Sequence, residues 1–266
     1  MGIFRPNYNR EGPGVSKEQA EKRRFFLFFD LLFRKSGRLI QANLLYFVTL
    51  LPTILGLVLF LFGQRLFGGV LYMLSALIVG PATAAFTYIL RNYAMQRHAW
   101  LLSDFFEQFK KNYKQGVIMG VLDLIIPVVA YVSFFYYRTI AQGPFAYVGL
   151  GATLLLIMIF AILNFYAYPI MVTFQLKFSE IFKNAIIFTL AKFPLNVLIL
   201  IVDAAICYGI LRLNVYLDLF VILPFFAFSL IGFINVFAAW GGIAALMLPE
   251  EEDDGESSLF SDERIQ

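Results

Sequence analysis

The sequence predicts an all-α fold, namely a polytopic membrane bundle of six transmembrane helices with three short amphipathic interfacial helices. Composition is the first observation that predicts it. Of the 266 residues, 60% are apolar, 18% are aromatic and only 15% are charged, which is far outside the range of soluble proteins. The second observation is that the apolar residues form long stretches spread along the chain. Because about 20 such residues cross the hydrocarbon core of a bilayer, one membrane domain fits the length better than two soluble domains.

The two ends of the chain differ from the region between them. Residues 1–24 are polar and include several prolines and glycines, so we expect a flexible cytoplasmic tail. The six-span membrane domain is expected at 25–249. Residues 250–266 begin with five consecutive acidic side chains and are predicted to form an acidic, disordered cytoplasmic tail.

The six spans are placed on stretches that lack charged residues or hold a single aspartate. Their predicted ranges are about 39–62, 66–90, 116–137, 145–174, 195–213 and 219–248. Only Gly63, Gln64 and Arg65 separate the first two stretches, which makes those helices antiparallel neighbours.

The second span, 66–90, is expected at the centre of the bundle. Gly80 and Ala84 lie on one helical face, where another helix can approach closely. Pro81 removes a backbone donor, so we expect a kink there that neighbouring helices cover. Gly116 and Gly120 also match a small-residue packing motif, although one such match is weak evidence.

Short aromatic segments precede the spans of each pair. The first, Arg23–Lys35, is too short to cross a membrane and is bracketed by cations, which is typical of a helix lying in the interface. The second covers about 102–113, where Asp104 and Glu107 fit the spacing of a capping box. The third opens at Ser179. We therefore expect three interfacial helices.

The distribution of Lys and Arg predicts the orientation. Seventeen of them fall in the N-terminal segment and in the connections 91–115 and 176–193, against three in the alternate turns. This is a strong positive-inside signal, which places both termini in the cytoplasm. The same layout of a short helix and two spans occurs three times, which favours three parallel two-helix repeats. The alternative is that any six-span protein with tight outer turns looks periodic.

Two aspartates inside predicted spans are the sharpest candidate site residues. Asp123 and Asp203 each lie well inside a span, where a carboxylate costs about 2.5–3.5 kcal/mol on insertion scales. They could line a polar pathway or bind a proton or a cation. The alternative is that they hydrogen-bond to backbone or to Asn43, Asn164 and Asn235 as contacts between helices, worth only about 0.6 kcal/mol each.

Other kinds of site are not indicated. The single histidine, His98, and the single cysteine, Cys207, are far apart in the sequence, so no metal site is expected. No catalytic residues and no cofactor are predicted, because the chain contains no hydrolase, metalloprotease or phosphate-loop motif. Basic segments beside membrane spans indicate anionic lipid headgroups rather than nucleic acid.

Several blocks of residues resemble the YesL-like family of bacterial integral membrane proteins, a domain of unknown function. The blocks are Met1–Phe4, Gly12–Val15, Lys22–Phe26, Gly80–Ala85, Tyr88–Asn92, Ser103–Phe106 and Phe109–Gln115. The resemblance covers about the first 130 residues. It implies a location in the bacterial plasma membrane and a link to carbohydrate uptake, and it transfers no catalytic residues.

Three functions compete at this point. The first is a transport-associated component linked to carbohydrate uptake, either a small carrier or an accessory to a sugar-uptake system. It predicts a polar cavity reached by Asp123 and Asp203. The second is a scaffold or signalling partner that binds another protein through its cytoplasmic amphipathic segments, and it predicts a closed bundle. The third, an intramembrane enzyme, is disfavoured because the chain lacks the residues for it.

Overall fold

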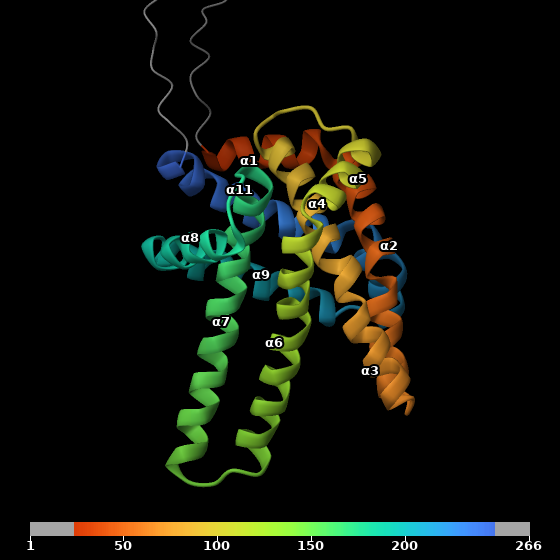
Figure 1. Cartoon of the computed structure of the whole chain (residues 1–266), viewed down its shortest axis with the longest axis vertical. Helices are drawn as coiled ribbons and strands as arrows, with labels where there is room; N and C mark the ends of the chain where they lie inside the picture. The colour runs from red at the N-terminus through yellow and green to blue at the C-terminus, as the bar shows by residue number, and fades with distance from the viewer. Residues whose placement is uncertain (1–23, 248–266) are drawn as a thin grey trace, which may run out of the picture.

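The structure, a computed structural model, describes residues 24–247 as a bundle of helices without strands in that range (Figure 1). The prediction of an all-α fold is confirmed. The elements in chain order are α1 (Arg24–Arg34), α2 (Ser36–Leu61), α3 (Arg65–Leu74), α4 (Ala76–Ala94), α5 (Leu101–Lys111), α6 (Tyr113–Thr139), α7 (Pro144–Thr173), α8 (Phe178–Ala191), α9 (Phe193–Leu211), α10 (Val215–Leu217), the π-helix η1 (Asp218–Ala227) and α11 (Phe228–Met247). The two tails predicted at 1–24 and 250–266 lie outside the described residues, except that Arg24 begins α1.

Within the described residues, six stretches are long and apolar enough to cross a membrane, as predicted. They are α2, α3 with α4, α6, α7, α9, and α10 through α11. Their ends differ by a few residues from the predicted ranges, because hydropathy marks the apolar part of a helix and not its last hydrogen-bonded turn. The largest differences are four residues, at the end of the second span, which continues past Arg91 to Ala94, and at the start of the sixth, which begins at Val215.

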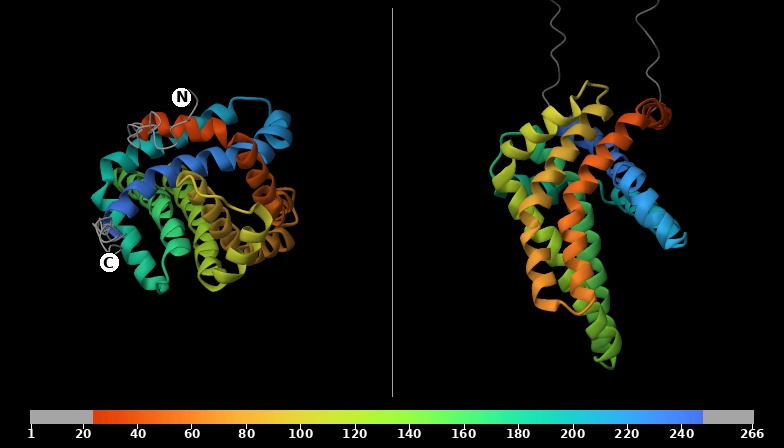
Figure 2. Two further views of the ribbon diagram at one scale, coloured as in Figure 1. Left: turned by 90° about the horizontal axis from the view of Figure 1, so that it is seen from above. Right: turned by 90° about the vertical axis from the view of Figure 1, so that its right-hand side faces the viewer.

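The helices form antiparallel hairpins with their tight turns at one end. Figure 1 shows α2 descending to the turn before α3, and α6 descending to the turn before α7. Both described ends of the chain, in α1 and α11, lie at the opposite end of the bundle, which we call the α1 end (Figures 1 and 2). The guanidinium of Arg24 links the start of α1 to the middle of α11, because it donates a hydrogen bond of 2.9 Å to the carbonyl oxygen of Phe237.

The order of elements repeats three times, each time with a short helix followed by two spans. The units begin at α1, α5 and α8. The third hairpin is more open than the others, because α9 packs only sparsely on η1 and α11, whereas α2 and α6 pack closely on the helices that follow them. Figure 2 shows η1 and α11 inclined to the long α6–α7 hairpin.

The second short helix begins earlier than its sequence pattern suggests. Its first residue is Leu101, so Asp104 does not precede the helix but lies in its first turn. There the Asp104 carboxylate accepts a hydrogen bond of 2.9 Å from the backbone N–H of Trp100. The side chain of Glu180 does the same in α8, where it accepts from the N–H of Lys177 over 2.9 Å. Both acids satisfy donors that a helix start leaves free.

The second span is divided into two helices at Ser75, a division that was not predicted. α3 ends at Leu74 and α4 begins at Ala76, so the division lies more than one turn before Pro81, and α4 continues through the proline. The hydroxyl of Ser75 donates to the carbonyl oxygen of Tyr72 over 2.6 Å. Serine side chains that bond backward in this way bend helices, and this contact gives a local reason for the position of the division.

The exterior of the bundle is apolar, as a lipid environment requires. Large side chains such as Tyr131, Leu198 and Leu211 are more than half exposed. Two buried clusters lie inside. One is built around α7 and contains Ile170, and the other is built around α4 and contains Ile89. The central position predicted for 66–90 holds for its second half, since most residues of α4 are buried.

Candidate functional site

The Asp123 carboxylate on α6 is held by two side chains of α7. The Nδ2 group of Asn164 donates to Oδ1 of Asp123 over 2.9 Å. The hydroxyl of Tyr168 donates to Oδ2 over 2.5 Å. Residues four apart lie on one face of a helix, so α7 presents both donors to α6. Asp123 is partly buried and Tyr168 is buried, so a polar centre lies between these two spans.

Contacts between hydroxyl groups extend from this centre to two further helices. The hydroxyl of Thr83 on α4 lies beside that of Tyr168. It donates to the carbonyl oxygen of Val79 over 2.8 Å, so the hydroxyl of Tyr46 on α2 is the donor in the 2.8 Å bond between Tyr46 and Thr83. The ring of Tyr46 stacks on Phe86, with centroids 4.4 Å apart. We refer to Tyr46, Thr83, Asp123, Asn164 and Tyr168 as the polar network, and it joins α2, α4, α6 and α7.

A close crossing of α4 and α6 positions the polar network. A Cβ atom on Gly80 would collide with the carbonyl oxygen of Gly116. On Gly120 it would lie 2.8 Å from the carbonyl oxygen of Ala76, which is closer than real Cβ contacts. The predicted packing residues therefore meet each other. Asp123 lies one turn after Gly120 on the same face of α6, which brings its carboxylate toward α4.

The remaining predicted packing residues lie at the same crossing. A Cβ atom on Gly116 would stand 2.8 Å from the Cα atom of Pro81. Pro81 and Ala84 are both buried, and Ala84 is fully buried. Two backbones can come this close only where side chains are absent or small.

Asp203 forms a second, separate cluster. Its side chain on α9 interacts with Asn235 on α11. The Oδ1 atoms of both residues are buried without a hydrogen-bond partner. α6 and α9 are not packed extensively against each other, so the structure does not bring Asp123 and Asp203 into one site.

Asn43 belongs to a third cluster, at the π-helix. Its Nδ2 group donates to the carbonyl oxygens of Leu223 and Pro224 over 2.7 and 2.6 Å. Its Oδ1 atom accepts from the N–H of Ser229 over 2.7 Å. A π-helix leaves backbone groups without their α-helical partners, and the fully buried Asn43 side chain satisfies those groups.

Arg91 is a buried cation that the sequence pattern did not reveal. It is 7% exposed, and its guanidinium donates to the carbonyl oxygen of Val172 over 3.1 Å and to Thr173 Oγ1 over 2.7 Å. It also lies over the rings of Tyr88 and Trp240. Arg91 closes a charge-free stretch, which marks the end of a span in the sequence. Its burial depends on α7 and α11, which the sequence alone does not place beside it.

Asn196 is a second buried polar residue outside the predicted set. The hydroxyl of Tyr166 donates to its Oδ1 atom over 2.6 Å. Its Nδ2 group donates to the carbonyl oxygens of Phe188 and Thr189, each over 3.2 Å. Asn196 is the second residue of the predicted fifth span, so an amide at the start of that apolar stretch was the signal that could have found it.

Residues that could hold a metal ion are not clustered in the described part of the chain. No group of three or more His, Cys, Asp or Glu side chains there is arranged for a metal. His98 is exposed in the connection between α4 and α5, with its ring 4.8 Å from that of Trp100. Cys207 is exposed on α9. What the predicted site residues offer chemically is therefore the hydrogen-bonded carboxylate of Asp123, which lies between α6 and α7.

The fold and the network define the class of the molecule as a multi-pass helical membrane protein with an ionisable group inside its bundle. Residues 39–134 match the sequence model of a family described as a protein of unknown function, DUF624. Comparison with curated proteins and with solved structures gives no match. The matched stretch runs from α2 into α6 and includes Tyr46, Thr83 and Asp123, whereas the two donors on α7 lie beyond it.

Proposed function

We propose that this chain is a transport-associated component of a bacterial plasma membrane, acting as an accessory to a carbohydrate-uptake system. Both ends of the chain are placed in the cytoplasm. The positive-inside distribution of Lys and Arg supports that orientation, and the described ends lie together at the α1 end of the bundle. The carbohydrate link rests on the resemblance to the YesL-like family, with which the match of residues 39–134 is consistent.

The observation that carries the proposal is the Asp123 carboxylate within the polar network. Carboxylates at membrane depth are costly, and they typically mark pathways, relays or couplings. Here both oxygens are bound by donors from the neighbouring helix. A change in the charge or bonding of Asp123 would therefore alter the contacts of α7 directly. It would reach α4 and α2 through the hydroxyl groups of Tyr168, Thr83 and Tyr46.

An accessory role fits the geometry better than a carrier role. A carrier requires a polar cavity that reaches the aspartates, yet neither Asp123 nor Asp203 lines any of the three described cavities. Asp203 is in a separate cluster with Asn235. We place no catalytic step on this chain, because its sequence contains no motif for one.

Uptake measurements test the proposal. The gene is deleted in its own bacterium, and the strain is complemented with wild type, Asp123→Asn or Asp203→Asn. Uptake of a labelled plant-derived oligosaccharide is then measured at matched protein abundance. We expect the deletion and Asp123→Asn to lower uptake, and Asp203→Asn to retain it. Uptake that is unchanged in the deletion strain contradicts the proposal.

Reconstitution separates an accessory from a carrier. The purified chain alone is placed in liposomes, and entry of the same labelled oligosaccharide is followed with and without a proton gradient. An accessory admits no sugar by itself. Entry above that of empty liposomes, abolished by Asp123→Asn, would instead support a carrier.

The second candidate function is a scaffold or signalling partner. The exposed face of α5 favours it, because Leu102 is 60% and Phe106 is 54% exposed beside the basic residues Lys110 and Lys111. Co-purification from bacterial membranes tests it with Leu102→Ser and Phe106→Ser, which should remove a bound protein without changing abundance. Loss of that protein with normal sugar uptake would favour the scaffold over the transport-associated role.

A further inference from the structure

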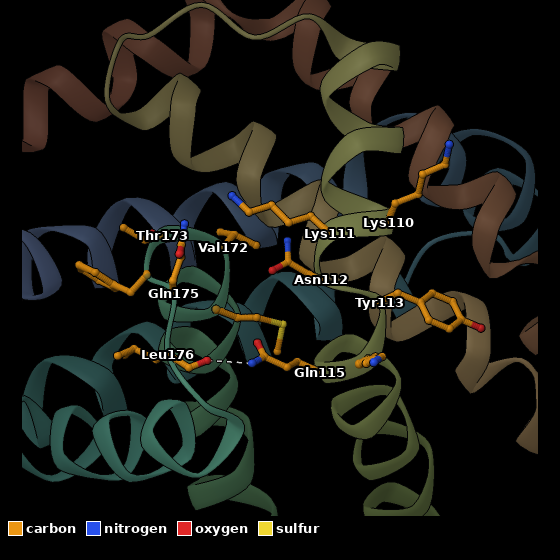
Figure 3. Close-up of a pocket in the computed structure, with 12 residues that line it drawn as sticks. Lys110, Lys111, Asn112, Tyr113, Gln115, Val172, Thr173, Gln175 and Leu176 are labelled. Carbon is orange, nitrogen blue, oxygen red and sulfur yellow. Dashed lines mark hydrogen bonds between the residues drawn. The ribbon is translucent and has the colours of Figure 1, made fainter.

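A basic recess lies at the α1 end of the bundle, outside the polar network. It has a volume of about 650 Å³ and is enclosed by the corner between α5 and α6 on one side and by the segment from Met171 to Leu176 on the other. Figure 3 shows Lys111 and Asn112 extending from the corner toward Val172 and Thr173, whereas Lys110 and Tyr113 point away. The recess is within the size range of small-molecule sites.

The charge of the recess is unbalanced. Its lining contains Lys110, Lys111 and Lys114 but no aspartate or glutamate. The amide of Gln175 and the hydroxyl of Thr173 add groups that can donate hydrogen bonds. Lysine, amide and hydroxyl donors that line one recess without a carboxylate match the oxygens of an anion.

Arg91 adds a buried positive charge behind the wall of the recess. Its guanidinium is bonded to Val172 and Thr173, which are both lining residues. No carboxylate oxygen of the described residues lies within 4.0 Å of Arg91, and its Nε atom is buried without a partner. A buried cation without an anionic partner is unfavourable. An anion in the adjacent recess would therefore lower the free-energy cost of burying the Arg91 guanidinium.

The position of the recess limits what can occupy it. It lies where α6 begins at Tyr113 and where α7 ends at Thr173, and therefore at the boundary between the spans and water. The side chain of Gln115 links the two walls of the recess, because its amide donates a hydrogen bond of 2.8 Å to the carbonyl oxygen of Leu176. A group at this level can arrive from the headgroup layer or from solution.

We propose that this recess binds a phosphomonoester, with Lys111 and Lys114 contacting the phosphate oxygens and the buried Arg91 supporting the negative charge from behind. The phosphomonoester can belong to a lipid headgroup or to a soluble phosphorylated compound. Lysine is a common ligand of phosphate, and both sources present the same dianionic group. This inference is independent of the role proposed for Asp123.

Binding measurements on the full chain distinguish the two sources. The purified chain is placed in nanodiscs of phosphatidylcholine. In one arm phosphatidic acid is added to the bilayer and retained lipid is counted by native mass spectrometry. In the other arm glucose 6-phosphate is titrated by calorimetry. Saturable binding in the first arm alone assigns a lipid headgroup, and binding in the second alone assigns a soluble ligand.

Charge variants test the assignment to the recess. Lys111→Gln with Lys114→Gln should weaken binding by about tenfold or more, because two charge-assisted contacts are lost. The control, Arg97→Gln with Lys183→Gln, removes two exposed charges outside the recess and should change the affinity less than about threefold. Lys111→Arg with Lys114→Arg should retain binding. Absence of binding in both arms, or equal losses in the double variant and its control, overturns the proposal.

Discussion

The hydroxyl of Tyr168 on α7 lies 2.5 Å from Oδ2 of Asp123 on α6. This contact joins two spans that the sequence separates by a turn at the far end of the bundle. It also connects the carboxylate to Thr83 and thereby to Tyr46. We expect the stability of the bundle and the role proposed for Asp123 to depend on it.

Removal of the Tyr168 hydroxyl is expected to weaken the bundle. Tyr168→Phe leaves one oxygen of the Asp123 carboxylate without its donor, so the free energy of unfolding should fall by about 1–2 kcal/mol. Unfolding by titration with sodium dodecyl sulfate in mixed micelles measures it. Tyr147→Phe, at a tyrosine 78% exposed on the same helix, is the control. If the two variants were equally stable, the contact between Tyr168 and Asp123 would not stabilise the bundle as proposed.

The two intramembrane aspartates should respond differently to the same substitution. Asp123→Asn presents an amide N–H₂ group where the carboxylate accepts from two donors, so we expect a loss of about 1–2 kcal/mol. Asp203→Asn should cost less than that, or nothing, because Asp203 Oδ1 has no hydrogen-bond partner and the nearby Asn235 Oδ1 lacks a donor. The same unfolding titration compares them. A larger loss at Asp203 than at Asp123 would contradict the assignment of the clusters.

The crossing of α4 and α6 should not tolerate a methyl group. Gly116→Ala places Cβ 2.8 Å from the Cα atom of Pro81, so the helices must separate at a cost of about 1–3 kcal/mol. Gly151→Ala in α7 is the matched control, because a Cβ there meets nothing within 4 Å, and it should be neutral or slightly stabilising. Thermal unfolding in detergent measures both. Similar melting temperatures for the two variants would show that the crossing is not close.

Asn43 is predicted to hold the π-helix in place. Asn43→Ala removes the hydrogen bonds to Leu223, Pro224 and Ser229, so backbone amides of η1 and early α11 should exchange faster with deuterium. Mass spectrometry of peptides covering 218–230 provides the measurement. Asn184→Ala on α8 is the control, since the Asn184 amide bonds only within its own helix. Unchanged exchange at 218–230 would refute this role.

The number and ends of the spans could be predicted because they depend on local composition. Apolar stretches of the required length, with a single aspartate in the one at α6, mark α2, α6 and α7 within a few residues. The packing faces of α4 and α6 were also predictable, since Gly80 and Ala84 on α4 and Gly116 and Gly120 on α6 are small residues at helical spacing. These features require no knowledge of which helix lies beside which.

The grouping of the polar residues could not be predicted, because it depends on contacts between distant segments. Asn164 was expected among five possible site residues, but only the packing of α7 on α6 selects it as the partner of Asp123. The π-helix is similar, since Asn43 stabilises it from α2. The division at Ser75 depends on a side-chain bond to Tyr72, for which a serine in an apolar stretch is weak evidence.

Labelling of single cysteines in intact cells tests the central claim, that six spans leave both ends of the chain on the cytoplasmic side. Cys207 is the one cysteine in the sequence, so Cys207→Ser gives a background without thiols. Single cysteines are then placed at Gln64 and Gln142, in the turns between hairpin helices, and at Arg97 and Gln175, at the α1 end. A membrane-impermeant maleimide should label the first pair in intact cells and the second pair only after lysis. Labelling of position 97 or 175 in intact cells, with 64 and 142 protected, would contradict the orientation on which the account rests.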